Sequence, residues 1–244
     1  MYTLRIFPKI KNSENFPWKI SVAIFQLKKF NQQLYNISQQ NKLMFIVFEG
    51  IDGCGKSTQM FKLAEYFYSL SKYCHILITR EAYKDRKIRE FLKHNESKDK
   101  AEKLTELFIQ DREEHISDLI LPNLKKDVIV LSDRYKYSTI CFQAAEGQDI
   151  KKLTEMQKDM PLPDYTFILD IPADAAFQRI CTRNNQMKKT EQNKFEENSE
   201  FLEKVRQNYL KLPKLLPEEN IIIINGAKQI EEIFEEIKNS INTD

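Results

Sequence analysis

The chain has 244 residues, of which 41% are hydrophobic, and its 38 basic and 36 acidic residues leave a net charge of +2. A chain of this length and hydrophobicity can bury its own core, which argues against wholesale disorder. The near-balance of charge excludes a strongly polybasic nucleic-acid binder, and no apolar run is long enough to predict a membrane-spanning helix.

The first 43 residues differ in composition from the rest. They carry seven basic residues and one acidic residue, a net charge of +6, so residues 44–244 carry −4. A basic, acid-poor segment is typical of an organelle-targeting presequence, although its single arginine and weak amphipathic pattern count against that interpretation. The alternative is translation from Met44, which directly precedes the first predicted strand. We therefore predict an N-terminal extension over 1–43, which need not belong to the mature protein, and a folded domain over 44–244.

From Met44 onward, short β-branched runs alternate with stretches compatible with helices. This alternation is typical of an α/β domain, because buried parallel strands appear as continuous apolar runs. The predicted strands are Phe45–Phe48, Ile76–Thr79, Val128–Leu131, Thr166–Ile171 and Ile221–Ile224. Helices are predicted over 56–71, 85–94, 100–120, 136–158, 173–183, 196–212 and 228–240. The polar stretch 184–194 lies between two of these helices and is predicted to be a mobile loop.

The strongest motif follows the first strand, where Gly50-Ile51-Asp52-Gly53-Cys54-Gly55-Lys56-Ser57 fits GxxxxGK[ST] at every fixed position. Glycines let the backbone curl so that its N–H groups surround phosphate oxygens, and the following helix adds a favourable dipole. In such a loop Lys56 reaches the β- and γ-phosphates, and the Ser57 hydroxyl ligates Mg²⁺. The predicted nucleotide-binding residues are Gly50, Ile51, Asp52, Gly53, Cys54, Gly55, Lys56, Ser57 and Thr58.

A phosphate loop predicts nucleotide binding but not the reaction. A switch GTPase usually carries an NKxD base reader, and the nearest string, Asn193-Lys194-Phe195-Glu196, lacks the aspartate. A motor ATPase usually closes a hydrophobic strand with an acidic pair, which neither Asp133-Arg134 nor Asp170-Ile171 supplies. A small-molecule kinase therefore fits these strings best.

The segments around the loop resemble the thymidylate kinases, which convert dTMP to dTDP. The similarity begins with FIVFEGIDGCGKSTQ (45–59), continues in the family's order and spacing, and covers essentially all of Met44–Asp244 but none of 1–43. Its other parts are ITREA (78–82), IREFL (88–92), LFIQDREEH (107–115), SDRYKYSTICFQ (132–143), PDYTFILDIP (163–172) and FLEKVRQNYLKL (201–212). The resemblance implies an α/β P-loop kinase fold in three layers, with a five-stranded parallel sheet flanked by helices and a short lid. It also implies ATP as phosphoryl donor, Mg²⁺ as cofactor and a homodimer.

The resemblance further implies an acceptor site for dTMP. Phe108 would stack on the thymine ring, and Arg112, four residues on and therefore on the same helix face, would donate to an exocyclic oxygen. Arg89 would contact the acceptor phosphate. The complete predicted set is Asp52, Glu81, Arg89, Phe108, Arg112, Arg134, Ser138, Thr139, Phe142 and Gln143.

Catalysis is assigned by resemblance to Lys56, Asp133, Arg134 and an arginine of the lid. Asp133 and Arg134 follow a buried strand, where ligands bind in open α/β sheets, so Asp133 could hold Mg²⁺ through water and Arg134 could clamp phosphoryl oxygens. Some family members carry the catalytic arginine in the phosphate loop, but this chain has Gly53 there. We therefore expect the lid to supply it through Arg183, with Lys188 or Lys189 as substitutes.

Two departures from the family pattern keep other acceptors open. Ala82 stands where the family usually has proline, and Phe142 replaces a tyrosine beside the sugar, so that the ring is kept but the hydroxyl is lost. The alternatives are a same-fold kinase for another pyrimidine nucleotide or a deoxynucleoside, and a non-catalytic ATP-binding regulatory protein.

Neither a nucleic acid nor a membrane is expected as partner. The four scattered cysteines form no CxxC pair, which indicates reduced thiols in a cytoplasmic protein.

Overall fold

The chain divides into two units, Met1–Asn41 and Lys42–Asp244. The computed structural model describes residues 44–71, 73–94, 100–184 and 189–242, without the side chains of 94, 183, 184, 189–198 and 242. All of these belong to the second unit. The predicted extension over 1–43 lies outside the described residues, so the domain division made from the sequence stays a prediction.

All five predicted strands form, and they join one parallel sheet in the order β2-β3-β1-β4-β5. Their bounds are β1 Phe45–Glu49, β2 Ile76–Arg80, β3 Ile129–Asp133, β4 Tyr165–Asp170 and β5 Ile221–Asn225. Every residue of the central strand β1 is buried, as expected for a strand with both faces covered. β3 and β2 lie on one side of β1, and β4 and β5 lie on the other side. In an open parallel sheet, ligands bind at the carboxyl ends of the strands beside the point where the strand order reverses, which here is β1.

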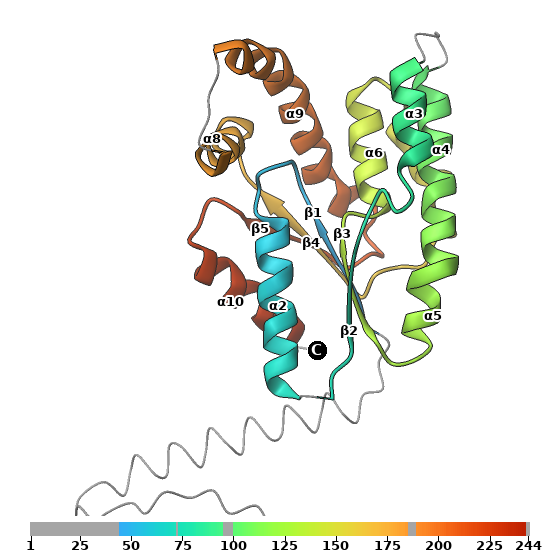
Figure 1. Ribbon diagram of the computed structural model, residues 1–244, viewed down its shortest axis with the longest axis vertical. Coiled ribbons are helices and arrows are strands. Elements are labelled where there is room, and N and C mark those ends of the chain that lie inside the picture. The colour runs from blue at the N-terminus through green and yellow to red at the C-terminus, as the bar shows by residue number, and fades with distance from the viewer. Residues whose placement is uncertain (1–43, 72, 95–99, 185–188, 243–244) are drawn as a thin grey trace, which may run out of the picture. The chain divides into compact units, whose positions relative to one another are not determined.

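Helices flank the sheet, which confirms the predicted α/β class (Figure 1). α2 packs against α10, and α6 packs against both α4 and α9. Figure 1 shows α3, α4 and α6 grouped together, with α9 between this group and α8. The bounds are α2 Lys56–Leu70, α3 Arg86–His94, α4 Lys100–His115, α5 Leu121–Leu124, α6 Lys136–Ala145, α7 Ile150–Glu155, α8 Ala173–Asn184, α9 Lys189–Leu215 and α10 Ile230–Asn242. No helix within these described ranges is long and apolar enough to cross a membrane.

Two predicted helices are each divided in the structure. The helix predicted over 136–158 is wrong as a single element, because Gly147 adopts a φ of +101° between α6 and α7. A residue with positive φ does not continue a right-handed helix, and glycine adopts this conformation at little cost. The helix predicted over 100–120 ends as α4 at His115 and continues as a π-helical turn, η1, over Ile116–Ile120.

The predicted mobile loop over 184–194 is wrong for most of its length. α8 continues through Asn184 and α9 begins at Lys189, so only 185–188 remain, and these residues lie outside the described part. The misassigned stretch is polar but rich in Lys, Gln and Glu, which favour helices, and it contains neither glycine nor proline. Polarity alone was therefore a poor guide to loop structure here, and the predicted lid stays a prediction.

Candidate active site

The phosphate loop connects β1 to α2 with a backbone that needs glycine. Gly50, Gly53 and Gly55 have φ values of +130°, +84° and +104°. A Cβ atom at Gly53 would lie 2.4 Å from the carbonyl oxygen of Ala176, and one at Gly50 would lie 2.7 Å from that of Leu169. The loop can therefore pack closely against β4 and α8 only because these side chains are absent.

Lys56, the first residue of α2, is buried within the loop. Its Nζ donates to the carbonyl oxygens of Gly50 and Ile51, each at 3.0 Å. The Cys54 side chain is fully buried beside it, with Sγ 3.8 Å from Nζ, which agrees with a space-filling role for this cysteine. Lys56 thus places a positive charge at the amino end of α2, where the helix dipole also favours an anion.

Ser57 and Asp133 come together from the start of α2 and the end of β3. The Ser57 hydroxyl donates to Oδ2 of Asp133 at 3.2 Å. The other carboxylate oxygen, Oδ1, is buried and has no hydrogen-bond partner among the described residues. A hydroxyl and a carboxylate are the hard oxygen donors that Mg²⁺ prefers, so these residues fit the predicted metal.

A cavity of about 770 Å³ surrounds the loop, and we call it the P-loop cavity. Besides Asp52–Gln59 and Asp133, it is lined by Arg179 on α8 and by residues that the sequence interpretation missed, which are Arg80 at the end of β2 and Ala227–Ile230 after β5. The sequence could have indicated Arg80 and Ala227–Ile230, because they lie at the carboxyl ends of predicted parallel strands, where ligands bind. Arg183, the predicted catalytic residue, lies one turn after Arg179 on α8, but its side chain is outside the described part.

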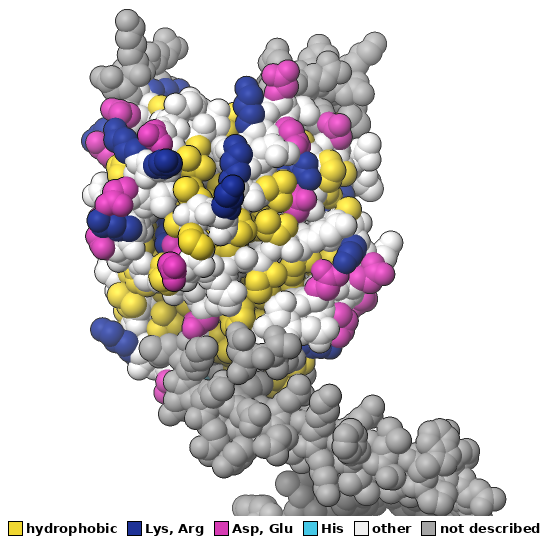
Figure 2. All heavy atoms as spheres, turned by 180° about the vertical axis from the view of Figure 1, so that it is seen from behind, with side chains coloured by type: hydrophobic (Ala, Val, Ile, Leu, Met, Phe, Trp, Pro, Cys, Tyr) yellow, Lys and Arg dark blue, Asp and Glu magenta, His cyan; other side chains and the backbone are white. Residues whose placement is uncertain are grey.

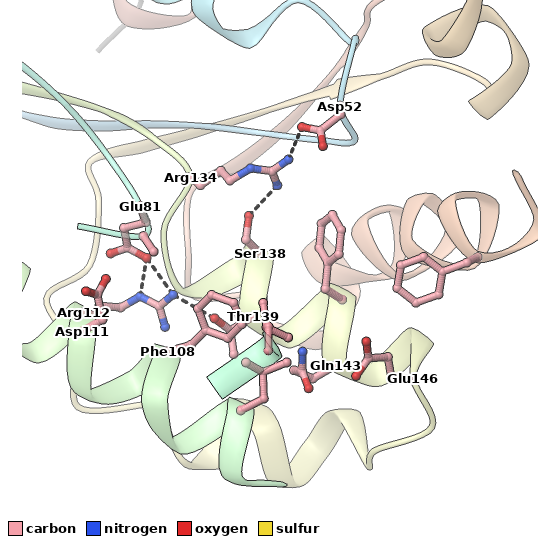
Figure 3. Close-up of a pocket in the computed structure, with 15 residues that line it drawn as sticks. Asp52, Glu81, Phe108, Asp111, Arg112, Arg134, Ser138, Thr139, Gln143 and Glu146 are labelled. Atoms are coloured by element: carbon pink, nitrogen blue, oxygen red, sulfur yellow. Dashed lines mark hydrogen bonds and ion pairs between the residues drawn. The ribbon is translucent and has the colours of Figure 1, made fainter. Parts of the chain in front are cut away.

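A second cavity, of about 400 Å³, lies between α4, α6 and α9, and we call it the acceptor cavity (Figure 3). Nine of the ten predicted substrate-binding residues line it. They are Asp52, Glu81, Phe108, Arg112, Arg134, Ser138, Thr139, Phe142 and Gln143. The structure also contributes Ala82, Leu92, Leu104, Asp111, Glu146 and Phe201, which had no predicted role.

Arg89 is the predicted substrate residue that does not line either cavity. Its side chain is 71% exposed on α3 and pairs with Asp85, one turn earlier in the chain. The structure therefore brings nine predicted residues together and leaves this one on the surface of the described domain. Its contact with an acceptor phosphate stays a prediction.

Arg112 is almost completely buried at the base of the acceptor cavity. Its Nε donates to Oε2 of Glu81 at 2.7 Å, and Nη2 donates to the Thr139 hydroxyl at 2.9 Å and to the Tyr135 carbonyl at 3.2 Å. Nη1 donates to Oε1 of Gln157. These bonds use four of the five guanidinium N–H groups and balance the buried charge, so one N–H on Nη1 is not used by them.

The Glu81 carboxylate is hydrogen-bonded to Arg112 and to His115. Its second carboxylate oxygen lies 3.3 Å from Nδ1 of His115, whose Nε2 lies 2.7 Å from the Thr79 hydroxyl. His115 is fully buried and stacks on Tyr83. In this geometry the Glu81 carboxylate fixes the position of Arg112, and its predicted role in substrate binding stays a prediction.

Arg134 lines the acceptor cavity and pairs with Asp52, which lines both cavities. It has a φ of +77°, and its guanidinium donates to Asp52 Oδ1 at 2.7 Å and to the Ser138 hydroxyl at 2.9 Å, above the ring of Phe142 (Figure 3). Burial acts to raise the pKa of Asp52, but the positive charges of Arg134, Lys56 and Arg80 outweigh it and lower that pKa. Asp52 lines both cavities, so a charged pair marks their junction.

Glu49, which the motif analysis missed, lines neither cavity but holds Ser138, which lines the acceptor cavity. It is fully buried, and Oε1 accepts hydrogen bonds from the backbone N–H groups of Tyr135 and Ser138 at 2.8 and 3.2 Å. Oε2 accepts from the Ser138 and Tyr209 hydroxyls, both at 2.7 Å. Burial raises the pKa of Glu49, although Arg134 and these hydrogen bonds oppose the change. The sequence could have indicated Glu49, because it is a charged residue at the end of a strand predicted to be buried.

Comparison with known proteins is consistent with this geometry. A family model described as thymidylate kinase matches residues 48–237. A thymidylate kinase of Thermosipho africanus is 37% identical over 206 residues, which cover 81% of this chain and 97% of that protein. A probable thymidylate kinase of Pyrococcus abyssi is 37% identical and covers 79% and 93%. The crystal structure of thymidylate kinase from Ehrlichia chaffeensis matches with a TM-score of 0.61 at 27% identity, over 81% of this chain and 98% of that one. The chain therefore belongs to the thymidylate kinase family.

Proposed function

We propose that the P-loop cavity binds ATP with Mg²⁺, that the acceptor cavity binds dTMP, and that the phosphoryl group passes between them at Asp52 and Arg134. Membership of the thymidylate kinase family assigns the reaction itself, which is ATP-dependent phosphorylation of dTMP to dTDP. The observation that carries the division of roles is that Asp52 lines both cavities, whereas Lys56 lines only the first and Arg112 only the second. Two substrates bound in this way would meet at the charged pair.

In the P-loop cavity, the chain's task is to bind and neutralise the phosphates of ATP. Backbone N–H groups of the loop and the Nζ of Lys56 would surround the β- and γ-phosphates. Ser57 and Asp133 would hold Mg²⁺, which neutralises charge that develops on the phosphate oxygens during transfer. In-line transfer needs little covalent chemistry from the protein, so positioning and electrostatic stabilisation account for most of the rate enhancement.

In the acceptor cavity, the chain would orient dTMP by its base and its phosphate. Phe108 supplies a face for the thymine ring, and the remaining N–H on Nη1 of Arg112 can donate to an exocyclic oxygen. Arg134 lies on the side of the P-loop cavity, where it can neutralise the acceptor phosphate. Phe142 contacts Phe201 and Arg134, so it can pack beside the sugar without a hydroxyl group.

Arg183 stays our candidate for the catalytic arginine of the lid. Its support is its place on α8, one turn from Arg179, which lines the P-loop cavity. An arginine that neutralises the transferring phosphoryl group is worth about 10³–10⁵ in rate. Arg179 is the second candidate, because the described structure already places it beside the phosphate loop.

The remaining expectations concern partners and location. A homodimer and a cytoplasmic location are proposed from the family resemblance and from four free cysteines, which suit a reducing compartment. No nucleic acid is proposed as partner, because basic and acidic side chains are interspersed and neither sign dominates the face seen in Figure 2. Nucleic-acid binding usually requires a continuous basic surface.

The test is a coupled assay of ADP release with ATP and Mg²⁺, comparing dTMP, dUMP, UMP, dCMP and thymidine as acceptors. We expect strong preference for dTMP, because the base would lie against Phe108 and Arg112. Equal activity with UMP would show that Phe142 does not exclude a ribose, and would move the sugar specificity elsewhere. ATP binding without release stimulated by any acceptor would support a regulatory protein, which membership of the family does not favour.

A further inference from the structure

Three groups hold the guanidinium of Arg134. It donates to Asp52 Oδ1 at 2.7 Å and to the Ser138 hydroxyl at 2.9 Å, and its Cζ lies 5.2 Å from the centroid of the Phe142 ring (Figure 3). The side chain of Asp52 is 65% exposed, so it is free to move with the guanidinium. Ser138 and Phe142 lie one turn apart on α6. The position of Arg134 therefore depends on what fixes these two residues of α6.

The Ser138 hydroxyl is held by two further groups. A guanidinium has only donors, so the oxygen of Ser138 must accept from Arg134 and its single hydrogen must go to another acceptor. Oε2 of Glu49 lies 2.7 Å away and is that acceptor. The Tyr209 hydroxyl lies 2.7 Å from the same carboxylate oxygen and 3.0 Å from the Ser138 oxygen. Glu49 and Tyr209 together therefore fix the direction in which Ser138 accepts.

The carboxylate of Glu49 receives four hydrogen bonds. Oε1 accepts from the backbone N–H groups of Tyr135 and Ser138, and Oε2 accepts from the hydroxyl groups of Ser138 and Tyr209. An ionised carboxylate offers about four acceptor positions, so each of these donors fills one. Three of the donors lie at the start of α6, whereas Tyr209 comes from α9. The network is complete only when α9 contributes its hydroxyl group.

α9 supports both residues of α6 that hold Arg134. Tyr209 is 1% exposed on α9, which packs against α6, and it supports Ser138 through its hydroxyl. Phe201 lies about two turns earlier on α9 and supports Phe142, with 6.1 Å between the ring centroids. A polar contact and an aromatic contact therefore run from α9 through α6 to the same guanidinium group.

We propose that Tyr209 is a positioning residue for the phosphoryl transfer: its hydroxyl and the Glu49 carboxylate fix Ser138, which holds the guanidinium of Arg134 beside Asp52. Tyr209 lines neither cavity, so it acts through Arg134 rather than by touching a substrate. Without its hydroxyl the buried carboxylate loses one of its four donors, and Ser138 is no longer held from that side. A displaced charge lowers the rate, because transfer depends on positioning and on electrostatic stabilisation. This inference rests on the proposed role of Arg134 at the acceptor phosphate.

The first test is the steady-state kinetics of Tyr209→Phe, with dTMP and ATP varied in turn. We expect kcat/KM for dTMP to fall by about tenfold, and the KM for ATP to stay within about twofold of wild type. The fall is limited because Arg134 keeps its contacts with Asp52 and Phe142. An unchanged kcat/KM for dTMP would overturn the proposal.

Tyr137→Phe is the matched control. Tyr137 is also fully buried, and its hydroxyl also bonds to a carboxylate, that of Glu219, but neither residue lines either cavity. The variant should lower the thermal unfolding midpoint, as Tyr209→Phe does, and leave kcat/KM for dTMP unchanged. An equal fall of kcat/KM in both variants would show that lost stability accounts for it, and would overturn the role of Tyr209.

A double-mutant cycle with Arg134→Met tests whether Tyr209 acts through Arg134. Methionine removes the charge and the donors of Arg134 and keeps a long side chain. If Tyr209 acts through the guanidinium, Tyr209→Phe should lower kcat/KM for dTMP by less than about twofold in the Arg134→Met background. A general structural role predicts the same fall in both backgrounds, and that result would overturn the proposal.

The single variant Arg134→Met distinguishes failure of this inference from failure of the proposed function. It should lower kcat/KM for dTMP by about 100-fold or more, because it removes a charge from the site of transfer. A fall of less than about threefold would overturn the proposed role of Arg134, and this inference with it. A large fall in Arg134→Met, together with unchanged kinetics in Tyr209→Phe, would overturn the role of Tyr209 alone.

Discussion

The P-loop cavity and the acceptor cavity are built in different ways. Eight of the seventeen residues that line the first come from one continuous stretch, Asp52–Gln59, and the other nine come from the ends of β2 and β3, from α8, and from the segment between β5 and the first turn of α10. The second is formed by side chains from the phosphate loop, the end of β2, α4, α6 and α9. A binding site made of backbone depends on where the chain can turn, whereas one made of side chains depends on which segments meet.

This difference predicts different sensitivities to substitution. In the P-loop cavity the loss of one charge should reduce the rate, because phosphates are neutralised by few groups. In the acceptor cavity the buried hydrogen-bond network should make substitutions affect recognition of one substrate, and stability with it. The following experiments test this contrast, beginning with the largest expected effect.

Lys56→Ala should lower kcat by about a thousandfold, since it removes the charge that would stabilise the transferring phosphoryl group. The measurement is the coupled assay with dTMP and ATP, alongside circular dichroism to follow the fold. Lys62→Ala is the matched control, because Lys62 lies on the same helix but pairs with Glu231 on the surface. Normal turnover in Lys56→Ala would defeat the assignment of the P-loop cavity to ATP.

Asp133→Asn should raise the Mg²⁺ concentration required for half-maximal activity by about 10- to 100-fold. The reason is that the buried carboxylate beside Ser57 would hold the ion through water, and an amide has no negative charge. The measurement is a Mg²⁺ titration at saturating dTMP. Asp149→Asn, at the amino end of α7, serves as a control that should leave the titration unchanged. An identical titration in Asp133→Asn would place the metal elsewhere.

Arg112→Lys should raise the KM for dTMP by about 10- to 100-fold and change that for ATP by less than about twofold. Lysine keeps the charge beside Glu81 but cannot reproduce the four bonds of the guanidinium group. Arg206→Lys is the matched control, because Arg206 forms a similar two-point pair with Asp170 outside the acceptor cavity. Equal changes for both substrates would contradict a role in reading the base.

Gly53→Ala and Gly147→Ala compare two glycines that both have positive φ. Gly53→Ala should lower the free energy of unfolding by about 2–4 kcal/mol, because backbone strain adds to a clash with the Ala176 carbonyl. Gly147→Ala should cost only about 1 kcal/mol, because no atom lies within 4 Å of the added Cβ. Urea unfolding measures both values. Similar losses would show that close packing of the phosphate loop against α8 contributes little.

Glu49→Gln should have the smallest effect, and that effect should depend on pH. Burial raises the pKa of Glu49 above its usual value of 4.5, so folding disfavours the ionised form. Its contribution to stability is fully present below pH 4.5 and is lost as the pH rises through the raised pKa. The variant does not titrate there, so any stability advantage of wild type over Glu49→Gln should decrease as the pH rises. Urea unfolding at about pH 5 and about pH 8 measures the change, and a difference that grows with pH would falsify the assignment.

Prediction from sequence succeeded for elements whose structure is determined by a short run of consecutive residues. The five strands were found because buried parallel strands are short apolar runs, and the phosphate loop was found because its glycines and Lys-Ser pair have fixed spacing. The nine predicted residues that line the acceptor cavity were chosen through resemblance, since Phe108 alone is an ordinary core residue by its pattern. The division at Gly147 and the helical start of α9 were missed because helix ends depend on single residues and weak local preferences.

The sequence by itself determined the alternation of strands and helices, the phosphate loop and the family, because these depend on neighbours along the chain. Only the tertiary structure decided how the buried polar groups of the site are paired. Arg112 pairs with Glu81, Glu49 pairs with Tyr209, and in each pair the partner comes from another segment. The physical reason is that a buried hydrogen-bonding group must find a partner in three dimensions, and the order of residues along the chain does not determine which group that is.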